Sequence, residues 1–180
     1  ADARVVALLR QHFDLPEFMA SIMAARGITS VEQAERFLNP SLDRDWLEPY
    51  DMPGIGEVVD HLEQAIRARR PIVVFGDFDV DGVSASAIMK LWLQAHGADV
   101  SVYLPSRHTE GYGLNAPAVR EIASTSKLMV TVDCGVTSVE LVDLAKSLGL
   151  TVIVTDHHRP GEQLPDCPVV NPLLNDYPFP

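Results

Sequence analysis

The sequence contains few cysteines and no long apolar run. Its two cysteines, Cys134 and Cys167, are too few for a disulfide framework and lack the spacing of zinc ligands. This usage suits a reducing compartment, so we expect the protein in the cytoplasm. No stretch is apolar enough to span a bilayer, and no charged-then-apolar leader opens the chain, so we expect no membrane partner.

Basic residues are also scarce. The 180 residues include 14 lysines and arginines against 25 aspartates and glutamates, which gives a net charge of -11. Surfaces that bind nucleic acid in general are usually basic, so this balance argues against such a surface. It does not exclude a carboxylate-rich site that acts on phosphate, because bound cations reverse the local field.

The two ends and the two halves of the sequence differ in pattern. The chain begins at Ala1 without a methionine and stops at Pro180, after residues 176–180 (DYPFP), without a terminal helix or charged tail, so we expect a fragment of a longer protein. Residues 1–70 show helical periodicity, and Ser30 with Gln33 forms a capping-box pattern. We therefore predict an N-terminal helical segment over residues 1–70 and a second domain, truncated at its end, over residues 71–180.

The second half alternates short apolar runs with helical segments. Strands buried on both faces imply a parallel sheet with right-handed crossovers. We predict an α/β fold with an open, mostly parallel sheet and helices on both faces. The predicted strands are 72–75, 100–104, 128–132 and 152–154, and the predicted helices are 83–96, 117–123 and 138–148.

Each predicted strand ends in polar residues. In an open parallel sheet the carboxyl ends of the strands share one edge, where ligands bind. Residues far apart in the sequence are therefore expected to become neighbours. The polar segments are 77–81 after the first strand, 105–113 after the second, 133–135 after the third and 156–158 after the fourth.

The acids of these segments suggest a metal site. Asp77, Asp79 and Asp81 alternate by two, so an extended segment would point all three to one side, where they repel unless a cation intervenes. Taken alone, this segment is equally well explained as a solvated acidic turn. Adding Asp133 and His157 from two other strand ends favours the metal site.

The ligand types indicate which metal. Carboxylates with imidazole and without thiolate suit Mn²⁺ or Mg²⁺. Four or more carboxylates can hold two ions about 3.5–4 Å apart, which together activate a water and stabilise the leaving oxygen of a phosphoester. We expect His157 to be a ligand and His158, which follows Asp156, to be a general acid or phosphate contact. The alternative for both histidines is a surface or loop-packing position.

The segment after the second strand is suited to substrate. The Arg107 guanidinium can bind a phosphate through two hydrogen bonds. Gly111 would allow the backbone to approach the substrate closely, and Tyr112 offers a ring for base stacking. The alternative is a glycine-bearing turn with a surface salt bridge.

Together these motifs resemble those of the RecJ exonucleases, a branch of the DHH phosphoesterase family. The resemblance extends to the N-terminal helices, and five motifs in this order and spacing are specific. The motifs are 76–82 (GDFDVDG), Arg107 with 110–113 (EGYG), 133–135 (DCG), 156–158 (DHH) and 171–172 (NP).

The resemblance implies a two-metal, Mn²⁺- or Mg²⁺-dependent 5′-to-3′ exonuclease that acts on single-stranded DNA in recombination and repair. It implies that Asp79 and Asp133 hold one ion with Asp77 nearby, and that Asp81, Asp133 and His157 hold the other, so that Asp133 bridges. It also implies a single-strand-binding protein and a RecQ-type helicase as partners.

The same resemblance assigns the remaining site residues. His158 corresponds to the second, catalytic histidine, with Asp156 and Arg107 in the catalytic set, and Arg107 and Asn171 correspond to phosphate or substrate contacts. Phe75 stands where smaller DHH phosphodiesterases carry a histidine, which favours the RecJ branch.

The resemblance also leaves two alternatives. A further acidic ligand, the DHHA1 domain and a nucleic-acid-binding domain are expected beyond Pro180, so this chain alone can be inactive. The acidic composition instead suits a phosphohydrolase of short oligonucleotides, cyclic dinucleotides or pyrophosphate. The third possibility is a DHH domain that serves as a non-catalytic scaffold.

Overall fold

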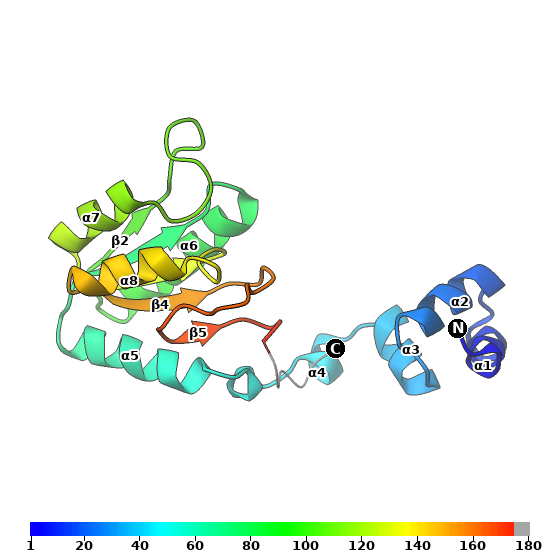
Figure 1. Ribbon diagram of the computed structural model, residues 1–180. Coiled ribbons are helices and arrows are strands. Elements are labelled where there is room, and N and C mark those ends of the chain that lie inside the picture. The colour runs from blue at the N-terminus through cyan, green and yellow to red at the C-terminus, as the bar shows by residue number, and fades with distance from the viewer. Residues whose placement is uncertain (175–180) are drawn as a thin grey trace. The chain divides into compact units, whose positions relative to one another are not determined.

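The computed structural model describes residues 1–174 and divides the chain into two compact units, Ala1–Glu48 and the part from Pro49 onward (Figure 1). The first unit is helical, and residues from α1, α2 and α3 form its small core. The predicted capping box is confirmed: the Gln33 amide donates to Ser30 Oγ at 3.1 Å, and the Ser30 amide donates back to Gln33 Oε1 at 3.2 Å. Its helices are α1 (Ala3–Phe13), α2 (Glu17–Ala25), α3 (Val31–Leu38) and α4 (Leu42–Asp45).

The second unit is built on a five-stranded sheet in which all strands run parallel, in the order β2-β1-β3-β4-β5. The four predicted strands are confirmed, and the two-residue β5 is an addition too short to be read from an apolar run. In chain order the elements are η1 (Pro49–Asp51), α5 (Ile55–Arg67), β1 (Ile72–Gly76), α6 (Val80–Ala95), β2 (Val100–Tyr103), α7 (Ala116–Thr125), β3 (Leu128–Val132), α8 (Val139–Ser147), β4 (Thr151–Thr155) and β5 (Val169–Val170).

Side chains of successive strand residues point to opposite faces of this sheet. In β1, Val73 and Phe75 join the core under α7 and α8, whereas Ile72 and Val74 join the core under α5 and α6 (Figure 1). The predicted α/β architecture with helices on both faces is therefore confirmed. Among residues 1–174, no helix combines the length and apolarity that crossing a bilayer requires.

The division between the units differs from the expected one. The prediction placed it after residue 70, but the contacts place it after Glu48. The reason is α5, which buries Val58, Leu62 and Ala65 in the same core as the strands. The periodicity of residues 55–67 identifies an amphipathic helix, but it does not identify the surface against which that helix packs.

A close backbone contact fixes the start of α6, and it leads to a prediction. A Cβ on Gly82 would lie 2.4 Å from the Asp77 carbonyl oxygen and 2.5 Å from the Asp77 nitrogen. We expect Gly82→Ala to lower the free energy of unfolding by about 3 kcal/mol, because backbone must move to admit the methyl group. Urea unfolding checks this.

The chain offers a matched control in Gly56 of α5. A Cβ at this position would meet nothing within 4 Å. Gly56→Ala is therefore expected to raise the free energy of unfolding by about 0.5 kcal/mol, since alanine loses less backbone entropy. Equal effects of the two substitutions would contradict the close contact at Gly82.

Candidate metal centre

Three acids stand at the same level of the sheet edge, because the strands that precede them are paired in register. Gly76 of β1 pairs with Val132 of β3, and Val132 pairs with Thr155 of β4. The next residue along each strand is an aspartate: Asp77, Asp133 and Asp156. The expectation that sequence-distant acids meet at one edge is met by this register.

These acids and the adjacent histidines form two groups with ligand atoms close enough to hold a cation. One group contains Asp77, Asp79 and Asp133, and the other contains Asp133, Asp156, His157 and His158. Within each group the candidate ligand atoms all lie within 4.8 Å of one another. Asp133 belongs to both groups, which is the position expected of a bridging ligand.

Asp81 lies apart from both groups. It is exposed in the first turn of α6, and it lines a cavity together with Asp133 and His157. Asp81 therefore faces the second group without joining it, and its predicted role as a ligand stays a prediction.

The backbone of Asp133 is strained. Its φ of 61° lies in the left-handed region, which residues other than glycine seldom adopt. The Thr131 hydroxyl donates to the Cys134 carbonyl oxygen at 2.7 Å and holds the turn that imposes this conformation. Such strain costs about 1–3 kcal/mol and is common at functional sites.

The carboxylate of Asp133 is also poorly satisfied. Its side chain is only 5% exposed, and among residues 1–174 its Oδ1 has no hydrogen-bond partner. His157 Nδ1 lies 3.1 Å from that oxygen, but the pair lacks hydrogen-bond geometry. Two ligands that each lie about 2.1 Å from an octahedral ion are about 3 Å apart, so this spacing fits a shared cation. A second buried carboxylate oxygen, Asp77 Oδ1, is likewise unpaired within the described residues.

The pKa values of Asp79 and Asp133 move in opposite directions. Burial raises the pKa of Asp133, and repulsion from the Asp79 carboxylate adds to this, with partial opposition from His157 and His158. Hydrogen bonds from the Gly82 and Asp81 amides, both 3.0 Å long, lower the pKa of Asp79, which caps α6. A cation between the two carboxylates would remove the repulsion.

Asp156 organises the loop that carries the histidines. Its carboxylate accepts hydrogen bonds from the Val136, His157 and His158 amides at 2.8–3.0 Å, and its Oδ1 lies 2.8 Å from His158 Nδ1. Burial acts to raise the pKa of Asp156, but these hydrogen bonds outweigh it and the pKa lies below its ordinary value. These contacts make Asp156 a support for the histidine loop, and its predicted place in the catalytic set stays a prediction.

His158 is the partner of Asp156. The hydrogen bond to the Asp156 carboxylate raises the pKa of His158, and partial burial opposes this only in part. The ring is therefore held ready to carry a proton at the edge of the site. This arrangement suits the predicted role of His158 as a general acid.

Asn171 lies beneath the same loop. Its side-chain amide donates to the His158 carbonyl oxygen at 2.8 Å, and its Oδ1 accepts from the Leu173 amide at 2.8 Å. The residue is 1% exposed. These contacts give Asn171 a supporting position beneath the loop, and its predicted role as a substrate contact stays a prediction.

The loop after β2 reaches the rim of the site. The Arg107 guanidinium lies 5.4 Å from the centre of the Phe78 ring, beside the acidic turn. The exposed Tyr112 places its hydroxyl 3.4 Å from both ring nitrogens of His158. Burial and the nearby acids raise the pKa of Tyr112 to about 12, so the hydroxyl stays protonated at neutral pH. Gly111, with a φ of 80°, permits the turn that presents Tyr112.

One residue that anchors this loop was given no role from the sequence. Glu110 accepts from the Tyr103 hydroxyl at 2.7 Å and from the Ser106 amide at 2.8 Å. These hydrogen bonds lower the pKa of Glu110, that of Ser106 most. Its place inside the EGYG segment was the available signal, but its partners come from folding.

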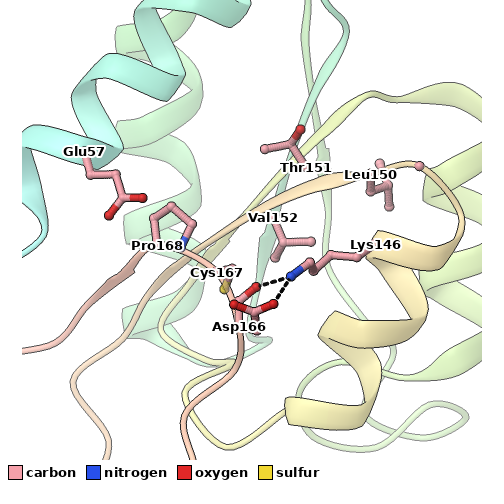
Figure 2. Close-up of a pocket in the computed structure, with 9 residues that line it drawn as sticks. Glu57, Lys146, Leu150, Thr151, Val152, Asp166, Cys167 and Pro168 are labelled. Carbon is pink, nitrogen blue, oxygen red and sulfur yellow. Dashed lines mark hydrogen bonds and ion pairs between the residues drawn. The ribbon is translucent and has the colours of Figure 1, made fainter.

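A second cavity lies at the opposite end of the sheet, at the start of β4 (Figure 2). Its volume is about 580 Å³, and Lys146 reaches across it to donate to the Asp166 carboxylate and carbonyl oxygens. Cys167 lies beside this pair, and burial raises the pKa of its thiol to about 11. None of the predicted site residues lines this cavity, so the candidate chemistry belongs to the carboxyl edge.

A parallel α/β sheet with clustered carboxylates and imidazoles at its carboxyl edge defines a domain of the divalent-metal phosphoesterase type. The DHH family, N-terminal domain, matches residues 71–178, and the chain belongs to this family.

Comparison with curated proteins points within the family to one branch. The chain is 40% identical over 166 residues to the single-stranded-DNA-specific exonuclease RecJ of Bacillus subtilis. The match covers 92% of this chain but 21% of the relative, so the chain spans about a fifth of that protein.

Comparison with solved structures points to the same branch of the family. An exonuclease RecJ bound to manganese is 42% identical, with a TM-score of 0.66 over 69% of this chain and 32% of the other. RecJ from Thermus thermophilus in complex with Mn²⁺ is 31% identical, with a TM-score of 0.70 over 99% of this chain and 25% of the other. The Thermus protein is also known in complex with Mg²⁺, at 28% identity and a TM-score of 0.51 over 88% and 19% of the two chains.

Proposed function

We propose that this chain is the metal-binding core of an exonuclease that hydrolyses single-stranded DNA from the 5′ end with Mn²⁺ or Mg²⁺. The observation that carries the proposal is the convergence of Asp79, Asp133 and His157 from three strand ends, with Asp133 strained, buried and unpaired among the described residues. The similarity to RecJ exonucleases supports the choice of substrate. Because the chain spans a small part of such relatives, we assign the complete activity to the full-length protein.

The donor set fits two ions. Asp77, Asp79 and Asp133 would hold one, and Asp133 and His157, with Asp81 facing them across the cavity, would hold the other. When bound, two such ions supply a nucleophile at neutral pH and stabilise the charge of the phosphate in the transition state.

His158 supplies the proton in the proposed reaction. As the oxygen of water bonds to phosphorus and water gives up a proton to solvent, the bond from phosphorus to the leaving sugar oxygen breaks. The leaving oxygen takes the proton of His158, which solvent then restores. The hydrogen bond to Asp156 raises the pKa of His158, which favours the protonated ring, and it orients the ring for this donation.

Arg107, Gly111 and Tyr112 form the proposed substrate side. Arg107 is the cation that the loop after β2 brings beside the acidic turn, and the exposed Tyr112 ring offers a surface for a base. We also propose a single-strand-binding protein and a RecQ-type helicase as partners and a role in recombination and repair, on family resemblance, and a cytoplasmic location, on the cysteine usage.

The proposal is tested with the full-length protein, Mn²⁺ and a long single strand labelled at its 5′ end. We expect release of labelled mononucleotides, and we expect His158→Asn to lower kcat by about 10²–10⁴-fold with Mn²⁺ affinity retained in calorimetry. His61→Asn, which changes a histidine of α5 away from the site, serves as the control and should leave kcat unchanged.

Two other results would redirect the assignment. The acidic composition motivates a hydrolase of short oligonucleotides, cyclic dinucleotides or pyrophosphate, and equal turnover of a dinucleotide and a long strand would support that activity. Failure of the full-length protein to bind Mn²⁺ would support a non-catalytic scaffold instead.

A further inference from the structure

The outward face of α6 is apolar. Three of its large side chains, Val80, Ile88 and Leu91, are 79%, 69% and 66% exposed, and Trp92 is half-exposed beside them. A helix that is apolar on its sheet side and on its outer side is normally enclosed by other elements. We therefore expect another structural element to cover the outward face of α6.

The spacing of the outward residues suits a helix as that partner. Val80, Ser84, Ala87, Ile88 and Leu91 recur at intervals of three and four residues, so they form one stripe. From Val80 to Leu91 the stripe is about 16 Å long at 1.5 Å per residue, or three helical turns. The small side chains of Ser84 and Ala87 between larger ones leave a groove for the ridge of a second helix.

A cavity of about 890 Å³ continues this stripe toward α5. Its walls include Val59 of α5, Ile88 and Trp92 of α6, and Val132 at the end of β3. Strands of a parallel sheet are normally covered on both faces. Here the part of the sheet face between α5 and α6 is left uncovered. Since its lining is mainly apolar, the cavity is a gap in the core layer.

We propose that this gap and the α6 stripe seat an apolar-faced helix from the polypeptide that RecJ-type chains carry outside the matched region. Two observations identify this occupant. Pro172, two residues after β5, lines the cavity, so the backbone leaving β5 runs along its wall. The matched part is only 21% of the Bacillus subtilis relative and 29% of the Salmonella typhimurium relative, so such chains have ample polypeptide to supply a helix.

Away from the metal centre, the chemistry of the lining favours an apolar occupant over DNA. The titratable side chains at the cavity are Asp81, Asp133, Asp156 and His157, all gathered at the end nearest the metal centre. These groups belong to the metal centre, and the rest of the lining is uncharged: among the described residues no lysine or arginine lines the cavity, so the part away from the metal centre offers phosphate no cation. A second copy of this chain could cover the stripe with its own α6, but that pairing would leave the cavity unfilled.

Hydroxyl-radical footprinting with mass spectrometry tests the proposal in the full-length protein, with the 180-residue chain for comparison. We expect Ile88, Leu91 and Trp92 to be modified at least about fivefold more slowly in the full-length protein. Leu148, exposed at the end of α8, is the internal control and should react equally in both. The modification rates do not depend on the proposed activity.

A pair of substitutions sharpens the test. Leu91→Lys should restore fast modification of Ile88 and Trp92 in the full-length protein and lower its Tm by several degrees, whereas Gln64→Lys, at an exposed position of α5 outside the cavity lining, should do neither. Equal modification rates in the two proteins would overturn the proposal. Protection that disappears on dilution, together with a dimer in light scattering, would assign the face to a second copy and would also overturn it.

Discussion

Asp133→Asn is expected to raise the Tm of the metal-free protein by about 2–4 °C, which corresponds to about 1 kcal/mol, and to abolish Mn²⁺ binding and turnover. The substitution removes a buried charge that is repelled by Asp79 and whose Oδ1 has no hydrogen bond among residues 1–174. Asparagine tolerates the left-handed φ of 61° at this position, so the fold is retained. Thermal unfolding and Mn²⁺ calorimetry measure the two effects.

The pH dependence of this effect has a definite sign. Because the pKa of Asp133 is raised in the folded state, its contribution to stability is present below the unfolded pKa and is lost as the pH rises through the folded pKa. The advantage of the asparagine variant should therefore grow from acidic to neutral pH. Added Mn²⁺ should stabilise the natural protein alone and reverse the order.

A second substitution separates charge from backbone strain. Asp133→Ala also removes the charge, but alanine in the left-handed region costs about 1–2 kcal/mol, so this variant should lose the gain in Tm. Mn²⁺ affinity equal to that of the natural protein in either variant would refute the bridging role of Asp133.

Asp156→Ala is expected to lower the free energy of unfolding by about 3 kcal/mol and to weaken Mn²⁺ binding severely, because buried donors without an acceptor are costly. The buried Asp156 carboxylate accepts hydrogen bonds from the Val136, His157 and His158 amides and pairs with the His158 ring. Urea unfolding and calorimetry measure both effects. Asp166→Ala is the matched control, because the exposed pair with Lys146 should contribute little to stability.

The Asp156–His158 pair also predicts a pH window. The lowered pKa of Asp156 gives stability that is present above its unfolded pKa and lost as the pH falls through its folded pKa. The raised pKa of His158 gives stability that is present below its unfolded pKa and lost as the pH rises through its folded pKa. The urea midpoint should be highest between the two folded pKa values, and Asp156→Ala should flatten this maximum. A maximum of unchanged height in the variant would contradict the pairing.

The acidic composition is compatible with the proposed DNA substrate if cations bind at the carboxyl edge of the sheet. A net charge of -11 gives no general surface for phosphate, but the groups at the sheet edge are suited to cations that reverse the local charge. Arg107 and Tyr112 add contacts at the rim of the same site. Affinity for a long strand is therefore expected to depend on the metal and on the rest of the full-length protein.

The sequence by itself determined the sheet and its functional edge. Apolar runs such as residues 128–132 predict buried parallel strands, and the polar residues that follow them meet because carboxyl ends of parallel strands share an edge. The capping box of Ser30 and Gln33 was equally local and was found in the structure. These features depend on neighbouring residues and on a general rule of topology, so they can be predicted without tertiary contacts.

The tertiary structure alone decided how each polar side chain is used. The turn held by Thr131 puts Asp133 in the left-handed region, the Val136 amide helps to make Asp156 a support, and burial under the histidine loop occupies Asn171. Likewise, α5 joins the sheet unit through Val58, although it precedes the first strand. The physical reason is that hydrogen bonds and packing between residues far apart in the sequence depend on distances in space, which residue types and spacing do not encode.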